Sequence, residues 1–164
     1  MADIGSTVPK TRRDGKIELI TNERTLEVKY EAGDFSASGL KPEQRDTTMI
    51  LDRGDFHALR YTDFTPFSLS FTCTLTDLSD GTDVLIRDAF TGEGAWASDT
   101  SAFGANAEVW GLKIRWALEG TDHGDSADHT MVCEPCAISG FEISEGDPGT
   151  LSVSMDVYAK PVYT

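Results

Sequence analysis

A strict alternation of apolar and hydroxyl side chains between residues 67 and 75 constrains the fold of this chain more than any other feature. Ser or Thr stands between five apolar residues placed at every second position: Phe67, Leu69, Phe71, Cys73 and Leu75. Because successive side chains of a β-strand point to opposite faces, this pattern predicts a strand with one buried face and one hydrated face.

The same period of two recurs along the chain. Large apolar side chains alternate with Lys and Arg in residues 110–118, and with Ser and Asp in residues 150–158. Weaker versions of the pattern predict four further strands, at residues 17–20, 26–30, 56–62 and 137–143.

Residues 82–90 have a different pattern. Thr82 can cap a helix, Asp83 places an acid in its first turn, and Gly92 can end it, so the segment predicts a short helix. The expected fold class is therefore mainly β: an antiparallel β-sandwich or open barrel with one short α-helix and long inter-strand loops.

Length and charge exclude several classes of protein. At 164 residues, we expect residues 1–164 to form a single domain. No apolar run is long enough to cross a membrane, and residues 1–16 lack the apolar stretch of a secretory signal, so we expect synthesis in the cytoplasm and no membrane partner. The net charge of −14, concentrated in the C-terminal half, disfavours non-specific binding of nucleic acid.

One set of side chains could bind a metal ion. Cys133 and Cys136 have a spacing found in zinc sites, and His123 and His129 could complete a tetrahedral site. A second Cys-x-x-Cys pair is absent, and Cys133 follows the apolar Met131 and Val132, so the alternative is that both cysteines are ordinary buried side chains. We therefore expect no obligatory cofactor, with zinc as the one candidate.

Motifs for catalysis are missing from the sequence. It contains no phosphate-binding Gly-rich loop, no nucleophile elbow and no His-Glu-x-x-His, so we do not expect an enzyme. The acidic stretch at 122–128 lacks the register of a calcium-binding loop. Arg53-Gly54-Asp55 is best interpreted as a tight turn.

The order of these features resembles that of the major tail tube proteins of long-tailed bacteriophages with non-contractile, siphovirus-type tails. The similarity extends over residues 14–160 and is carried by short motifs: Asp14-Gly15-Lys16-Ile17, Tyr30-Glu31-Ala32-Gly33-Asp34, Asp52-Arg53-Gly54, Tyr61 to Pro66, the helix with Trp96, and the strands at 108–116 and 151–157.

The resemblance implies a structural protein of the virion tail, made in the host cytoplasm. Such subunits form hexameric rings that stack into a hollow tube, through which DNA passes to the host without specific binding. The other partners would be further tail proteins, such as the tape measure, the terminator and the distal tail protein. An N-terminal arm (1–16), a long loop (36–56) and a C-terminal tail (160–164) would bridge neighbouring subunits.

Charged residues of these segments are the candidate assembly residues, and the basic ones among them could pair with the acidic C-terminal half of a neighbour. In the loop they are Lys41, Glu43, Arg45, Asp46, Asp52, Arg53 and Asp55, and in the N-terminal arm Lys10, Arg12 and Arg13. An acidic lining would repel DNA and let it slide. Four polar residues near two predicted strands are candidates for this lumen face: Thr72, Thr74, Asp77 and Asp156.

Two alternatives remain open from the sequence. Another virion ring protein, such as a tail terminator or a head–tail connector, would form single rings. A metal- or sugar-binding β-sandwich module would stay monomeric and bind its ligand through residues 121–136.

Overall fold

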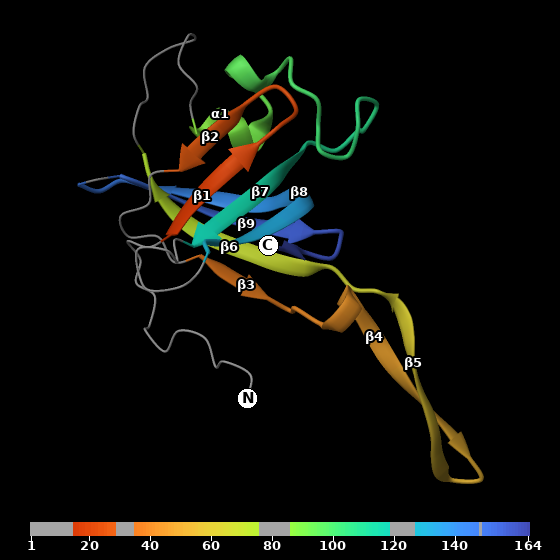
Figure 1. Cartoon of the computed structure of the whole chain (residues 1–164). Helices are drawn as coiled ribbons and strands as arrows, with labels where there is room; N and C mark the ends of the chain where they lie inside the picture. Colours follow the sequence, from red (N-terminus) through yellow and green to blue (C-terminus); the bar gives the residue numbers. More distant parts are fainter. Residues whose placement is uncertain (1–14, 29–34, 76–85, 119–126, 148) are drawn as a thin grey trace.

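The computed structural model describes residues 15–28, 35–75, 86–118, 127–147 and 149–164. Strands dominate this part of the chain, with one α-helix and two short 3-10 helices (Figure 1). The elements are β1 (Gly15–Ile20), β2 (Thr25–Val28), β3 (Ser36–Ser38), η2 (Pro42–Gln44), β4 (Arg45–Asp52), β5 (Asp55–Phe64), β6 (Phe67–Thr74), α1 (Ile86–Thr91), η3 (Gly94–Trp96), β7 (Gly111–Leu118), β8 (His129–Ser144), β9 (Thr150–Val157) and β10 (Val162–Tyr163).

Eight strands form one antiparallel sheet in the order β2-β1-β7-β8-β9-β6-β3, with β10 paired to β8. The long strand β8 joins its two halves: its first part pairs with β7 and its second part with β9, and Cys136 is opposite both Leu112 and Val157. In the described part of the chain the two end strands, β2 and β3, do not pair with each other, so the barrel is not closed.

Both halves of the sheet bury their apolar faces in a single core. Ile17, Leu112 and Ile114 enter it from the β1–β7 half, while Leu69 and Met155 enter it from the β6–β9 half. The stacking of Phe35, just before β3, on Trp116 of β7, with ring centroids 4.9 Å apart, joins the two halves on the open side. The fold is therefore the open, sandwich-like β class expected from the alternation of side chains.

The helix α1 covers one end of this core. Its Ala89 and Phe90 are buried, and the Phe90 ring lies 6.1 Å from that of Phe71. Gly92 ends the helix with φ +68°, and a Cβ atom there would lie 2.7 Å from the Trp110 ring, so only glycine fits. The predicted helix is confirmed from Ile86 onwards, whereas residues 82–85 are outside the described ones.

The three clearest predicted strands are confirmed as β6, β7 and β9. In β6, buried Phe67, Leu69, Phe71 and Cys73 alternate with more exposed Ser and Thr. The strand predicted at residues 137–143 is only the second part of β8, which begins at His129. Pro135, which has no N–H to donate, lies at the register shift where β8 changes partner.

The chain between residues 36 and 64 contains more regular structure than a single loop and one strand. Residues 36–56 are not one long loop, because they contain β3, η2 and β4. The strand predicted at residues 56–62 is confirmed as part of β5, which pairs with β4 in a two-stranded sheet separate from the core.

Residues 160–164 contact the same chain. Val162 and Tyr163 pair with β8 as β10, and Thr164 exchanges backbone hydrogen bonds with Thr130. None of the described helices is long and apolar enough to cross a membrane.

Two phenylalanines in different environments test this description of the core. Phe71→Ala should lower the free energy of unfolding by about 3–5 kcal/mol, because it opens a cavity between β6 and α1. The matched control is Phe56→Ala on the separate two-stranded sheet, which should change stability by no more than about 0.5 kcal/mol. Urea denaturation of dilute protein measures both, and equal losses would contradict the assignment of Phe56 outside the core.

Candidate functional site

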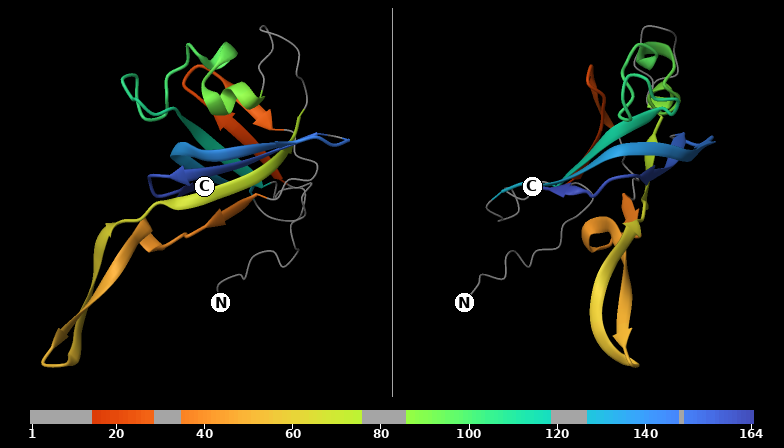
Figure 2. Two further views of the ribbon diagram at one scale, coloured as in Figure 1. Left: turned by 180° about the vertical axis from the view of Figure 1, so that it is seen from behind. Right: turned by 90° about the vertical axis from the view of Figure 1, so that its right-hand side faces the viewer.

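The β4–β5 hairpin (residues 45–64) extends away from the rest of the molecule (Figures 1 and 2). Its turn consists of Arg53 and Gly54, both with positive φ, +50° and +93°. This two-residue turn, with both central residues in the left-handed region, matches the twist of a hairpin. The interpretation of Arg53-Gly54-Asp55 as a tight turn is confirmed.

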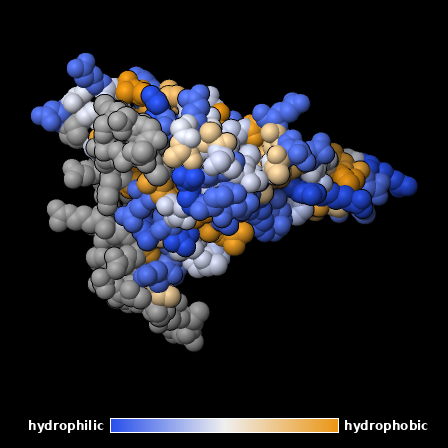
Figure 3. Space-filling model, turned by 90° about the horizontal axis from the view of Figure 1, so that it is seen from above, coloured by the Kyte–Doolittle hydropathy of each residue, from blue (hydrophilic) through white to orange (hydrophobic). Residues whose placement is uncertain are grey.

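One face of the β4–β5 hairpin is apolar and uncovered. Residues 47, 49 and 51 of β4 share this face with the residues opposite them on β5, and the other face carries Thr48 and Arg60. Five large side chains on the apolar face are 50–65% exposed: Met49, Leu51, Phe56, Leu59 and Tyr61. Figure 3 shows hydrophobic side chains just behind the hydrophilic tip of this projection. Contiguous exposed apolar surface of this kind marks an interaction site.

Gln44 anchors the base of the β4–β5 hairpin. Although polar, its side chain is fully buried. Its Nε2 donates hydrogen bonds to the carbonyls of Gly39 (3.0 Å) and Thr65 (2.8 Å), while its Oε1 accepts one from the Lys41 N–H (3.2 Å). The Thr65 N–H in turn donates to the Gln44 carbonyl (2.9 Å). One side chain therefore joins the segments that enter and leave the hairpin.

The backbone at this anchor is held in a sparsely populated conformation. Glu43 and Gln44 have φ of +54° and +51°, in the left-handed region that non-glycine residues rarely adopt. Such a conformation persists only where the surroundings hold it, and here the three side-chain hydrogen bonds of Gln44 do so. The direction of the hairpin is thus set within the subunit.

Charged residues surround the anchor. Lys41 forms an ion pair with Asp46, which also accepts a hydrogen bond from the Thr65 hydroxyl. The hydrogen bond from Lys41, followed by that from Thr65, holds the pKa of Asp46 below its usual range. The Lys160 ammonium lies 2.6 Å from a Glu43 carboxylate oxygen, which links the C-terminal region to the hairpin base.

The predicted assembly residues thus fall into two groups. Lys41, Glu43 and Asp46 make contacts within the subunit at the hairpin base. Four others are exposed on the hairpin. Arg45 is at the start of β4, and Asp52, Arg53 and Asp55 are at the tip. The N-terminal candidates Lys10, Arg12 and Arg13 lie outside the described residues.

The candidate lumen residues Thr72, Thr74 and Asp156 share the polar face of β6 and β9, while Asp77 lies outside the described residues. Cross-strand hydrogen bonds connect this face: Ser68 donates to Asp156 (2.9 Å), and the Thr72 and Ser152 hydroxyls lie 3.1 Å apart. The paired positions continue into β3 and β8 and are mostly Ser or Thr. Among them only Asp156 and Glu142 are charged, so this face is rich in hydroxyl groups rather than in acids.

The four metal candidates do not share one environment. Cys133 and Cys136 are buried in the core, where the Cys136 thiol donates to the Cys133 carbonyl (3.2 Å). His129 is exposed at the start of β8, and His123 lies outside the described residues. Within the described ranges, no group of three or more His, Cys, Asp or Glu side chains is arranged to hold a metal ion.

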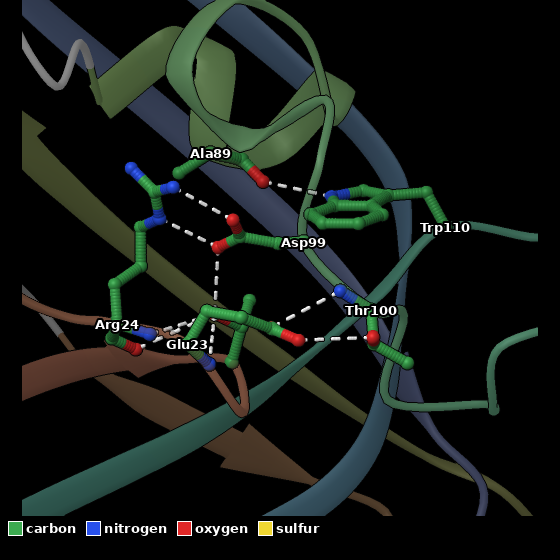
Figure 4. A network of polar contacts seen from close by, with 7 residues as sticks. Glu23, Arg24, Ala89, Asp99, Thr100 and Trp110 are labelled. Carbon is green, nitrogen blue, oxygen red and sulfur yellow. Dashed lines mark hydrogen bonds and ion pairs between the residues drawn. The ribbon is translucent and has the colours of Figure 1, made fainter.

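A polar network that the sequence did not predict fixes the loop after η3 (Figure 4). The buried carboxylate of Asp99 accepts two hydrogen bonds from Arg24, at 2.6 and 2.7 Å, and one from the Thr21 hydroxyl at 2.8 Å. Beside it, Thr100 donates to Glu23 through its N–H and its hydroxyl. These contacts join the β1–β2 turn to the loop, and we assign them a structural role.

Comparison with known proteins relates this fold to tail structures. No family model matches the sequence, and no curated protein matches it. Solved structures do match. A chain in the structure of the PVC sheath/tube terminator, from an extracellular contractile injection system, has a TM-score of 0.60 at 10% identity, covering 96% of this chain and 97% of that one.

Two further structures show the same likeness. A chain of the anti-feeding prophage tube-terminating cap has a TM-score of 0.59 at 8% identity, over 99% of this chain and 95% of that one. A chain of the SPP1 tail tube has a TM-score of 0.56 at 12% identity, over 95% and 79%. At these identities the likeness concerns the fold, which is tail-tube-like. Because the similar structures include contractile systems, the likeness does not distinguish non-contractile from contractile tails.

The buried side chain of Gln44 generates a prediction about the hairpin base. Gln44→Glu keeps the acceptor for Lys41 but loses both donated hydrogen bonds, so stability should fall by about 1–3 kcal/mol. The Thr65 amide should also exchange its hydrogen faster. The neighbouring control, Glu43→Gln, removes only the exposed pair with Lys160 and should change stability by less than about 1 kcal/mol. Denaturation and hydrogen exchange test this, and an unchanged Thr65 amide would contradict the anchor.

The buried thiols generate a second prediction. Burial raises the pKa of Cys73 and of Cys133 to about 12, and raises that of Cys136 as well. At pH 8 the folded chain should therefore react very slowly with iodoacetamide, because the thiolate is the reactive form. After denaturation, all three cysteines should be labelled, as mass spectrometry would show. Rapid labelling of any cysteine in the folded chain would contradict its burial.

Proposed function

We propose that this chain is the subunit of a viral tail tube, in which hexameric rings stack into a hollow conduit for the genome. The observation that carries the proposal is the apolar face of the β4–β5 hairpin, which no described part of its own subunit covers. An isolated two-stranded sheet is only marginally stable in water, so a partner that buries this face would also stabilise it. The tail-tube-like fold makes a second copy the natural partner.

Open sheet edges support lateral association within a ring. In the described part of the chain, β7 pairs with β8 only as far as Ala137, and β3 pairs with β6 only at Ser68–Ser70. The later residues of β8 and β6 therefore each have one edge that no described strand pairs with. A neighbouring copy could pair with such an edge through main-chain hydrogen bonds and extend the sheet around a ring.

The hydroxyl-rich face is the proposed lumen lining. The paired positions on β3, β6, β8 and β9 include Asp156 and Glu142 but no Lys or Arg. Contacts from Lys and Arg to phosphates supply most non-specific affinity for DNA, so a face without them would let DNA pass. In this role the chain is a structural component and not an enzyme, and it requires no cofactor.

We further propose that the subunit belongs to the virion tail, after synthesis in the cytoplasm of a bacterial host. The motifs of the sequence favour a non-contractile tail, with the tape measure, terminator and distal tail proteins as its other partners. The N-terminal arm (1–16) and the exposed hairpin charges would then add contacts between neighbouring subunits.

A terminator that caps a tube is the second candidate function. Two of the similar chains come from structures described as a sheath/tube terminator and a tube-terminating cap. The two functions differ in assembly, since a terminator closes a tube with a single ring, whereas a tube subunit polymerises without a fixed limit.

Electron microscopy of the purified full chain at rising concentration, with light scattering in parallel, tests the proposal. We expect long hollow tubes of constant diameter. The double variant Leu51→Ser/Phe56→Ser should fold but form no tubes, because its hairpin face has lost two large apolar side chains. The same change at Val109, which is exposed elsewhere, should leave tubes intact. Single rings would instead favour the terminator, and light scattering at monomer mass throughout would contradict self-assembly.

A further inference from the structure

We propose that the end of the sandwich formed by the β8–β9 turn is the acceptor for the β4–β5 hairpin of a second copy. This inference rests on the proposed function and deepens it, because it names the surface that covers the apolar hairpin face. The acceptor consists of Phe141 and Ile143 at the end of β8, together with the acidic residues around them, Glu142, Glu145 and Asp147.

The acceptor is apolar at its centre. Phe141 and Ile143 lie opposite Val153 and Leu151 of β9, and those two residues are buried in the core. Phe141 and Ile143 are on the same face of the sheet but are 42% and 52% exposed. The core-facing side of the sheet therefore continues past the part of the molecule that covers it, and its last two apolar side chains are available to a partner.

The hairpin and the acceptor lie at opposite ends of the same strand. β6 begins at Phe67, only three residues after the hairpin ends at Phe64. At its other end, Thr74 is opposite Thr150, and Thr150 is in turn opposite Ser144 at the end of β8. Figures 1 and 2 show the two features projecting from opposite sides of the molecule.

When the copies point the same way, this arrangement gives a head-to-tail contact. Such a contact between two different surfaces is heterologous, so a pair of copies leaves one hairpin and one acceptor unused. Repetition of the contact along the direction of β6 stacks copies without a limit.

Arginines of the hairpin can add to the apolar contact. The hairpin carries Arg45, Arg53 and Arg60 among its charged residues, together with four aspartates. The acceptor carries Glu142, Glu145 and Asp147, and residues 137–159 contain no Lys or Arg. The acidic rim can pair with individual arginines of the hairpin, while the apolar centre packs against its apolar face.

Site-specific cross-linking between two tagged copies tests the contact. One copy carries Leu51→Cys and the other Ile143→Cys, and a short bismaleimide joins thiols that lie close together. The three native cysteines are buried and serve as an internal background. We expect a dimer joined through positions 51 and 143 only when both variants are mixed under assembly conditions. The matched control replaces Ile143→Cys with Val109→Cys, which is 54% exposed but lies outside the acceptor, and should give no such product.

A second variant keeps the test independent of cysteine chemistry. Phe141→Ser/Ile143→Ser removes side chains that are half exposed and should raise the critical concentration for tube growth about tenfold or more, as expected for the loss of contact residues at an interface centre. Circular dichroism and the melting temperature check that the variant folds.

The outcomes separate this inference from the proposed function. Tubes that form without the 51–143 product, or that form normally from Phe141→Ser/Ile143→Ser, would overturn the acceptor and leave the tube subunit intact. Absence of both tubes and product would overturn both. The cross-linked pair together with tubes, and a raised critical concentration of the double serine variant, would establish the contact.

Discussion

The architecture depends on the single strand β8, which is shared between two halves of one sheet. Cys136 is opposite Leu112 on one side and Val157 on the other, so the two halves are joined through continuous backbone rather than through a loop. This pairing places both apolar faces in one core. It also decides where the described sheet ends, because β8 continues beyond β7, and no described strand pairs with the other edge of its last residues. The core and the proposed association surfaces therefore have the same origin.

Most of the core strands could be predicted from the sequence, because burial on one face imposes a period of two that β6 and β9 show plainly. The β4–β5 hairpin could not be placed in the same way. Phe56 and Leu59 are apolar side chains on a strand, yet they are exposed in the subunit. Periodicity reports that a face is apolar, and it does not report whether the same chain or another copy covers that face.

The residues that position the hairpin give still weaker signals. Gln44 is a polar residue after Lys41-Pro42-Glu43, a stretch typical of a surface turn, and only the structure shows it fully buried between Gly39 and Thr65. For the two cysteines, in contrast, the sequence contained signals for two different interpretations. Cys133-x-x-Cys136 has the spacing of metal ligands, but the alternative of simple burial, also visible in the sequence from the apolar Met131 and Val132, agrees with the position of both thiols in the core.

The hydrogen bonds on the hydroxyl-rich face have a mechanical consequence. Ser68 donates to Asp156, and one hydroxyl of the Thr72–Ser152 pair donates to the other, so part of the hydrogen-bonding capacity of this face is already used across the strands. Side chains that are already hydrogen-bonded gain little free energy by binding DNA. A neutral hydroxyl binds water but does not attract counterions. In a tube built from this subunit, friction along the wall would be low for any base sequence, and it would depend only weakly on the salt concentration inside.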